Sequence, residues 1–225
     1  MAMLPASPSD PALLHVRQLN AWYGQAHIVF NVDLEVHAGE VVALVGSNGA
    51  GKSTTLKAIM GLVDRVSGDI RFAGQPVLGL PPYRIARRGI GYVPEDRRVF
   101  SELTVLENLA TGRRPAPPGQ AAWTPERLFA LFPNLGTMPH RRGQHMSGGE
   151  QQMLTVARTL MGNPRLILLD EPSEGVAPIL VEQMAEMVLA LKREGLAVLL
   201  SEQNEAFVER VADRRLQLDQ GRLLP

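Results

Sequence analysis

One glycine-rich stretch decides the fold of this chain: Gly46-Ser47-Asn48-Gly49-Ala50-Gly51-Lys52-Ser53-Thr54. The apolar run Val41–Val45 comes just before it and predicts a strand buried on both faces, as in a parallel sheet. Residues 55–62 come just after it and predict a helix. A strand, a loop of the form G-x-x-x-x-G-K-S/T and a helix, in this order, predict a phosphate-binding P-loop. The alternative is an ordinary glycine-rich turn between a strand and a helix.

The residue types of this stretch suit phosphate groups. Glycine lets the backbone turn tightly, so that several N–H groups point inward and form a nest for phosphate oxygens. The following helix adds the free N–H groups of its N-terminus and the positive end of its dipole. Lys52 supplies a positive charge for the β- and γ-phosphates, and the Ser53 hydroxyl is placed to ligate Mg²⁺. The stretch therefore predicts that the chain binds a nucleoside triphosphate.

The composition limits the other functions of the chain. Its 225 residues suffice for one sizeable domain, and its 23 basic and 23 acidic residues cancel, which gives no sign of a nucleic-acid partner. It has no cysteine, so disulfides and thiolate metal sites are excluded. No apolar run approaches the roughly 18 residues that span a bilayer, and residues 1–12 lack a signal-peptide pattern. We expect a cytoplasmic protein with a flexible arm at residues 1–12, and peripheral attachment to a membrane complex stays open.

Two strands are predicted before the P-loop strand. Residues 14–19 alternate loosely between apolar and polar, and residues 28–36 do so with period two, which predicts an antiparallel β element. Tyr23 lies between them. An aromatic side chain there can stack on a nucleotide base, which is worth roughly 1–3 kcal/mol per base. A core or surface aromatic is the alternative.

A further strand, Ile90–Val93, carries Glu95 just beyond its end. Doubly wound sheets bind their ligands at the carboxyl ends of their strands, so Glu95 is a candidate active-site residue. An ordinary polar loop residue is the alternative.

The following residues, about 100–163, predict an inserted helical segment, because Thr104 and Glu107 form a capping-box pattern at its start.

A second helix start carries the pattern of an anion site. Ser147 is a good N-cap residue, and Gly148 and Gly149 expose backbone N–H groups at the beginning of a helix that runs to about Met161.

Two adjacent carboxylates follow the next buried strand. Residues 166–169 are apolar, and Asp170 and Glu171 come directly after them, which is the Walker B arrangement. Asp170 can hold the water shell of Mg²⁺, and Glu171 can polarise an attacking water. The alternative is a plain buried strand that ends in a surface turn. The remaining chain alternates helix and strand, which predicts an α/β parallel sheet.

The P-loop, the Ser-Gly-Gly helix start and residues 168–172 (Leu-Leu-Asp-Glu-Pro) occur in an order that resembles the ATP-binding subunit of an ABC transporter. The Ser147-Gly148-Gly149 signature discriminates, because it belongs to this one branch of P-loop proteins. Residues 91–100, 146–154 and 202–204 resemble the smaller ATPase subunit of branched-chain amino-acid transporters. The resemblance implies an ABC ATPase domain over residues 13–225. Its fold is that of an α/β P-loop NTPase with a mostly parallel sheet, an N-terminal antiparallel β element and an inserted helical subdomain.

The resemblance also implies roles for matching residues. Tyr23 matches the aromatic that stacks on adenine, and Glu171 matches the catalytic carboxylate that acts with Lys52 on ATP. Ser147 and Gly149 match groups that contact the γ-phosphate of an ATP held by the opposite subunit. Two ATPase subunits are therefore expected to sandwich two ATP molecules head to tail, with permease subunits and, indirectly, a solute-binding protein as partners.

Three positions depart from the general ABC pattern. Glu95 stands where a glutamine usually faces Mg²⁺, Gln203 stands at the switch-histidine position, and Ala177 stands at the D-loop aspartate position. Glu95 can still ligate Mg²⁺, and the amide of Gln203 can still donate a hydrogen bond to a γ-phosphate. Gln203 cannot carry a proton, so a role that needs an imidazolium is in doubt here.

Two other classes of ATPase compete with a transport motor. Repair ATPases of the coiled-coil type place hundreds of residues between P-loop and signature, and ribosome-acting members carry two cassettes in one chain, whereas this chain has one P-loop and one signature close together. A P-loop kinase or GTPase leaves the signature unexplained, and the guanine-reading Asn-Lys-x-Asp motif is missing. The resemblance to the branched-chain subgroup implies the motor of an importer for branched-chain amino acids. Alternatives are an importer for urea, amides or other amino acids, and an ABC-type ATPase that does no transport.

Overall fold

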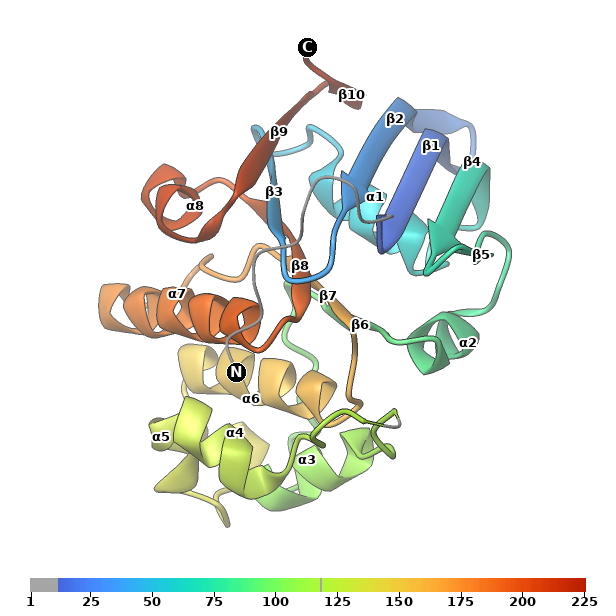
Figure 1. The fold of residues 1–225 in the computed structure, drawn as a ribbon. Coiled ribbons are helices and arrows are strands. Elements are labelled where there is room, and N and C mark those ends of the chain that lie inside the picture. Colours follow the sequence, from blue (N-terminus) through green and yellow to red (C-terminus); the bar gives the residue numbers. More distant parts are fainter. Residues whose placement is uncertain (1–11, 118) are drawn as a thin grey trace.

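The computed structural model describes residues 12–117 and 119–225. The arm expected at residues 1–12 lies outside the described residues except for its last position, so it stays a prediction. This part of the chain forms two sheets and a group of helices (Figure 1).

The larger sheet has the strand order β10-β9-β3-β8-β7-β6. Its strands pair in parallel, except for the antiparallel pair at the β10 edge. This confirms the mostly parallel sheet. The strands are β3 (Val41–Val45), β6 (Ile90–Val93), β7 (Leu166–Asp170), β8 (Ala197–Glu202), β9 (Arg214–Asp219) and β10 (Arg222–Leu223).

The smaller sheet is antiparallel and has the order β2-β1-β4-β5. Its strands are β1 (Leu14–Tyr23), β2 (Ala26–Val36), β4 (Arg65–Phe72) and β5 (Gln75–Pro76). The expected N-terminal β element is confirmed, but it draws two strands from beyond the P-loop helix. Tyr23 ends β1 instead of lying in a loop between strands, because β1 continues its pairing with β2 up to Tyr23 and Ala26.

Helices cover both faces of the parallel sheet and fill the segment between β6 and β7. Figure 1 shows this segment as the lower part of the molecule, below α7. The helices are α1 (Lys52–Ile59), α2 (Pro82–Arg87), α3 (Val105–Gly112), α4 (Pro125–Leu131), α5 (Pro133–Gly136), α6 (Gly148–Leu160), α7 (Pro178–Arg193) and α8 (Glu205–Val211), with a 3₁₀ turn at Gly143–His145. The limits 100–163 of the inserted subdomain stay a prediction.

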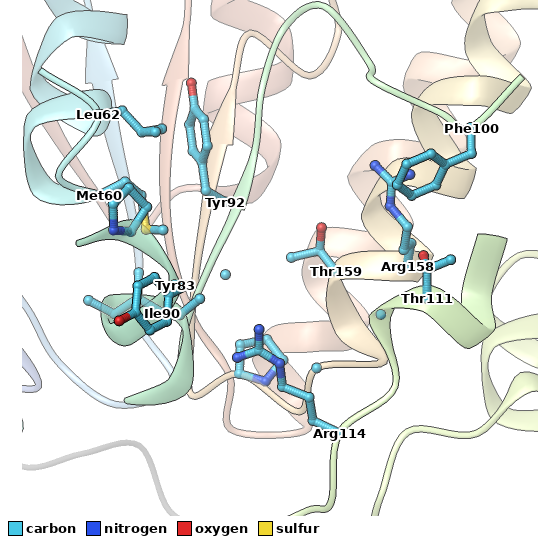
Figure 2. Close-up of a pocket in the computed structure, with 16 residues that line it drawn as sticks. Met60, Leu62, Tyr83, Ile90, Tyr92, Phe100, Thr111, Arg114, Arg158 and Thr159 are labelled. Atoms are coloured by element: carbon cyan, nitrogen blue, oxygen red, sulfur yellow. The ribbon is translucent and has the colours of Figure 1, made fainter.

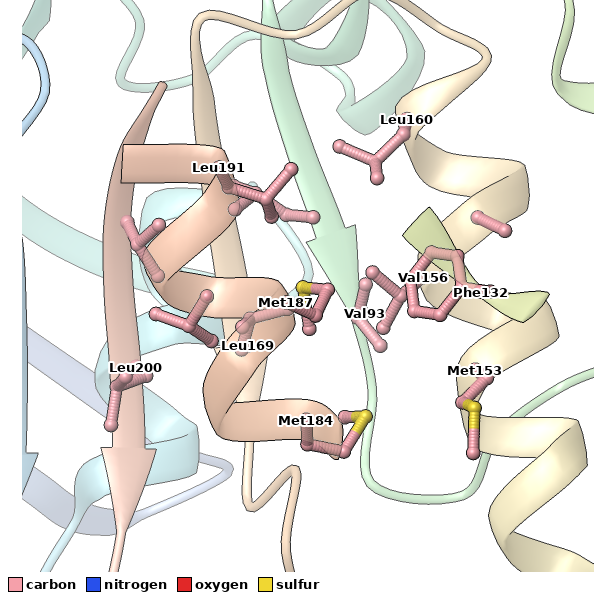
Figure 3. Packing of buried hydrophobic residues seen from close by; sticks show 14 of the residues in the cluster. Val93, Phe132, Met153, Val156, Leu160, Leu169, Met184, Met187, Leu191 and Leu200 are labelled. Carbon is pink, nitrogen blue, oxygen red and sulfur yellow. The ribbon is translucent and has the colours of Figure 1, made fainter. Parts of the chain in front are cut away.

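The central strands divide the core into two clusters. In β7 the side chains of Leu166 and Leu168 join a cluster with α1 and the antiparallel sheet, whereas Ile167 and Leu169 join a cluster with the helices. Successive side chains of a strand point to opposite faces, so a fully apolar strand serves two cores. Figure 3 shows Met153 and Val156 of α6 packed toward Val93 and Leu169 of the sheet. The loops that follow these central strands therefore start from strands that are buried on both faces of the sheet.

The helix starts follow their capping residues. Thr104 and Ser147 each form the two hydrogen bonds of a capping box, with Glu107 and Glu150 as partners. The P-loop helix begins at Lys52, earlier than the expected residue 55, because Gly51 adopts the left-handed conformation (φ 104°) and lets the helix start at once. The elements α5, β5 and β10 were not expected, since such short segments show no periodicity.

Candidate active site

The P-loop joins β3 to α1 and wraps around the amine of Lys52. The Lys52 Nζ donates to the backbone oxygens of Gly46 at 2.8 Å and Ser47 at 3.1 Å. The same Nζ lies 3.0 Å from Glu171 Oε1, and both side chains are at most 5% exposed. A buried charge is stable only when it is paired, so these two groups neutralise each other in this conformation.

The carboxylate of Asp170 is fully buried and receives three hydroxyl groups. Ser53 Oγ and Ser201 Oγ each donate to Asp170 Oδ1 at 2.7 Å, and the Tyr92 hydroxyl donates to Oδ2 at 2.9 Å. Burial, followed by the nearby charge of Asp170, raises the pKa of Tyr92 above its usual range, so this hydroxyl stays a donor. The Asp170 carboxylate is therefore held in one orientation.

Glu171 continues the strand into a left-handed residue (φ 48°), an unusual conformation for a residue with a side chain. Its backbone N–H donates to the oxygen and to the Oγ of Ser201, both at 3.1 Å. Gln203 Nε2 lies 3.3 Å from both carboxylate oxygens of Glu171 and donates to Asn48 Oδ1 at 2.6 Å. Gln203 thus bridges the carboxylate and the P-loop.

A cavity of about 520 Å³ lies over these groups. It is lined by Tyr23, Ile28, Asn48, Gly49, Gly51, Lys52, Ser53, Thr54, Glu95, Glu171 and Glu174. Tyr23 is 47% exposed, so its ring is free to contact a ligand. The structure therefore brings the P-loop together with the other predicted site residues, which are Tyr23, Glu95, Asp170, Glu171 and Gln203. The roles of these residues stay predictions.

The acidic side of this cavity fits a divalent cation. Partial burial, followed by the charges of Glu174, Asp170 and Glu171, raises the pKa of Glu95, so negative charge dominates around this carboxyl group. The Ser53 hydroxyl donates its hydrogen bond to Asp170, so its oxygen lone pairs can face a cation. Mg²⁺ prefers such oxygen ligands.

The signature lies elsewhere. Ser147, Gly148 and Gly149 do not line the cavity over the P-loop. They begin α6, where a Cβ atom on Gly148 would overlap the guanidinium of Arg97. Within one chain the predicted P-loop half and the predicted signature half of the site are therefore separate. Ala177, at the start of α7, makes no side-chain cap bond.

Several residues of the site were missed in the sequence. Ser201 and Tyr92 hold Asp170 from the two strands that flank β7: Ser201 of β8 is the register partner of Asp170, and Tyr92 of β6 pairs with Leu168, two residues earlier. The buried Glu202 accepts hydrogen bonds from the backbone N–H groups of Ser173, Gln203 and Asn204. A polar residue that follows an apolar run at a strand end is the signal that could have identified Ser201 and Glu202.

A second cavity, of about 480 Å³, lies between the parallel sheet and the helical segment. Figure 2 shows Tyr83, Ile90 and Tyr92 on one side and Phe100, Arg158 and Thr159 on the other. We call this cavity the groove. Tyr83 and Phe100 are more than half exposed, and Phe100 stacks on the Arg158 guanidinium at 4.9 Å. The groove is therefore an apolar surface with basic groups at its edge.

Comparison with known proteins decides the family. Residues 29–174 match the family model described as ABC transporter. The chain belongs to the ABC transporter family.

Relatives of this ABC ATPase are similar along most of its length. The high-affinity branched-chain amino acid transport ATP-binding protein BraG of Pseudomonas aeruginosa is 44% identical, over 94% of this chain and 91% of that protein. The lipopolysaccharide export system ATP-binding protein LptB of Haemophilus influenzae is 36% identical, over 95% and 89%. A crystal structure of a nucleotide-free ATP-binding cassette from an ABC transporter superposes with a TM-score of 0.80 at 27% identity, over 96% of this chain and 90% of that chain.

The family fixes the general activity. This ABC ATPase binds ATP and hydrolyses it, as its P-loop and its adjacent carboxylates predicted. Within the described residues, no helix combines the length and the apolar character that a bilayer crossing requires. Homologues of this ABC ATPase work as dimers with permease subunits in transporters.

Proposed function

We propose that this chain is the ATP-hydrolysing subunit of an importer for branched-chain amino acids, attached to the cytoplasmic face of the membrane. The identity of 44% with BraG, against 36% with LptB at similar coverage, carries the choice of solute and of direction. The residues 91–100 and 202–204, which include Glu95 and Gln203, support the same subgroup.

The binding step uses the groups over the P-loop. The backbone of Gly46 to Thr54 and the Lys52 amine hold the phosphates of ATP, and Tyr23 stacks on the adenine. Ser53, Asp170 and Glu95 hold Mg²⁺, which neutralises charge on the β- and γ-phosphates when bound. Because Lys52 is paired with Glu171 before ATP arrives, the γ-phosphate takes over this amine and leaves the carboxylate free.

The hydrolysis step uses Glu171 and Gln203. Glu171 orients a water for in-line attack on the γ-phosphorus and accepts its proton, while the Gln203 amide donates to the γ-phosphate. The separation of the Ser147 signature from the P-loop cavity supports a partner: the signature of each subunit closes the ATP site of the other. The partner is a second ATPase subunit, and the subgroup favours a different chain.

The permease subunits contact the groove. Its apolar aromatic rim and its Arg114 and Arg158 guanidinium groups suit a short amphipathic helix that carries an acidic residue. Closure of the ATPase dimer then moves the permease subunits between their two conformations, and a solute-binding protein delivers the amino acid on the other side.

Uptake measurements test the assignment. Disruption of the gene should abolish high-affinity uptake of radiolabelled leucine, isoleucine and valine. The wild-type chain should restore it, and the Glu171→Gln chain should not. Normal leucine uptake after disruption would contradict the proposal. Loss of urea or amide uptake would then indicate a related importer, and loss of lipopolysaccharide from the outer surface would indicate an exporter.

A further inference from the structure

Tyr92 belongs to two sites at once. Its ring lines the groove, where Figure 2 shows it facing Leu62 and Met60, and its hydroxyl donates to Asp170 Oδ2 at 2.9 Å. No other residue that lines the groove contacts Asp170 by a hydrogen bond in the described part of the chain. Among the described residues, Tyr92 is therefore the direct contact between the groove and the Asp170 carboxylate.

The hydroxyl of Tyr92 sets the orientation of this carboxylate. Asp170 Oδ1 receives two hydroxyl groups, from Ser53 and Ser201, whereas Oδ2 receives the Tyr92 hydroxyl alone among the described side chains. Without Tyr92 the carboxylate could rotate about the Oδ1 contacts. Hydrogen-bond partners of metal-binding carboxylates determine how well these carboxylates hold a cation.

The segment that follows Tyr92 is fastened to the opposite wall of the groove. Thr155 donates to the backbone oxygen of Arg97, and Arg158 Nη2 donates to that of Arg98 at 2.7 Å. Arg97 and Arg98 both have positive φ angles, of 62° and 43°, so this short segment has a constrained shape. The segment that follows Tyr92 therefore connects the end of β6 to α6, which forms the opposite wall of the groove.

We propose that Tyr92 is a positioning residue that links the groove to the ATP site: occupation of the groove shifts its ring, and its hydroxyl then changes how Asp170 holds the divalent cation. This inference deepens the proposed function and rests on the cation site assigned there. It gives a permease segment in the groove a direct route to the carboxylate, because the contact spans a single side chain.

The first test measures cation binding to the isolated chain. Tyr92→Phe keeps the ring and removes the hydroxyl, and Tyr83→Phe removes a hydroxyl from the same groove that makes no hydrogen bond in the described residues. Mn²⁺ affinity in the presence of ATP is measured by electron paramagnetic resonance. We expect Tyr92→Phe to weaken Mn²⁺ binding by roughly tenfold while metal-free ATP binding is kept, and Tyr83→Phe to match the wild type. Equal Mn²⁺ affinity in Tyr92→Phe and the wild type would overturn the inference.

The second test fills the groove without a permease. The chain has no cysteine, so Leu62→Cys can be labelled with fluorescein maleimide inside the groove, and Leu78→Cys outside it serves as the control. We expect the groove label to change Mn²⁺ affinity by roughly fivefold in the presence of Tyr92 and to have no effect in the Tyr92→Phe background. An unchanged affinity with Tyr92 present, or the same change in Tyr92→Phe, would overturn the link to the groove.

These outcomes are separate from those of the transport proposal. A wild-type chain that binds Mn²⁺ and responds to the groove label, but whose loss leaves leucine uptake normal, would overturn only the choice of solute. A wild-type chain that binds no Mn²⁺ with ATP would overturn the proposed cation site and this inference together.

Discussion

The Lys52 Nζ lies 3.0 Å from Glu171 Oε1, with both side chains buried beneath the P-loop. The residue that should hold the phosphates and the residue that should activate water thus neutralise each other while no phosphate is bound. Exchange of Glu171 for the γ-phosphate on Lys52 would couple ATP binding to the release of the catalytic carboxylate.

This ion pair predicts a stability effect in the nucleotide-free protein. Lys52→Ala leaves the Glu171 carboxylate buried with only the Gln203 amide as a partner, and we expect the free energy of unfolding to fall by about 3 kcal/mol. The double variant Lys52→Ala/Glu171→Gln has no buried charge at this place and should recover most of that loss. Urea unfolding of both variants measures it. A double variant as unstable as the single one would show that the pair is not the cause.

Gln203 predicts a pH profile without an imidazole. The amide of Gln203 does not titrate at physiological pH, and none of the residues that line the ATP cavity is a histidine. We therefore expect the pH profile of ATP hydrolysis by Gln203→His to show an added inflection at about pH 6.5, since a histidine beside Glu171 titrates in this range. Turnover of both proteins between acidic and mildly basic pH measures this. Identical profiles would separate Gln203 from the reacting groups.

Glu95 predicts a pH dependence of cation affinity. The pKa of Glu95 is raised by its partial burial and by neighbouring carboxylates, so it keeps a proton at higher pH than an ordinary glutamate. A cation must displace that proton, and Mn²⁺ affinity with ATP should therefore weaken as the pH falls through this raised pKa. Glu95→Gln should bind Mn²⁺ more weakly at neutral pH but with a flatter pH dependence. The same slope in both proteins would exclude Glu95 as a ligand.

Alanine substitutions at Gly46 and Gly49, two positions of the same loop, should lower the free energy of unfolding by different amounts. A Cβ atom on Gly46 would overlap the backbone oxygen of Leu218 in β9, whereas one on Gly49 meets nothing within 4 Å and only strains its φ of 81°. Gly46→Ala should lower the free energy of unfolding by about 3 kcal/mol and Gly49→Ala by about 1 kcal/mol. Thermal unfolding of the two variants compares them, and equal losses would contradict the close approach of β9.

Local patterns predicted the parts of this fold that they encode. The helix after Thr104 begins where the capping-box pattern predicted it, because Thr104 and Glu107 form both hydrogen bonds of that box. The strand before Asp170 was predicted from its apolar run, and the parallel sheet followed from the alternation of strands and helices.

The contacts of Asp170 could not be predicted in the same way. Its hydroxyl donors Tyr92 and Ser201 depend on the strand order β8-β7-β6, which no local pattern specifies. The contact of Arg97 with Gly148 depends on how the loop after β6 packs against the start of α6, and several elements of the chain lie between these two segments. Residues that act through such tertiary contacts carry no signal in their own segment.

ATP turnover by the Glu171→Gln variant tests the central claim most directly. The amide keeps the shape of the side chain but cannot accept the proton of the attacking water. The account predicts that this variant binds ATP as tightly as the wild type, accumulates a closed dimer and loses hydrolysis by at least about a hundredfold. Near-normal hydrolysis by Glu171→Gln would contradict the assignment of Glu171 as the catalytic carboxylate.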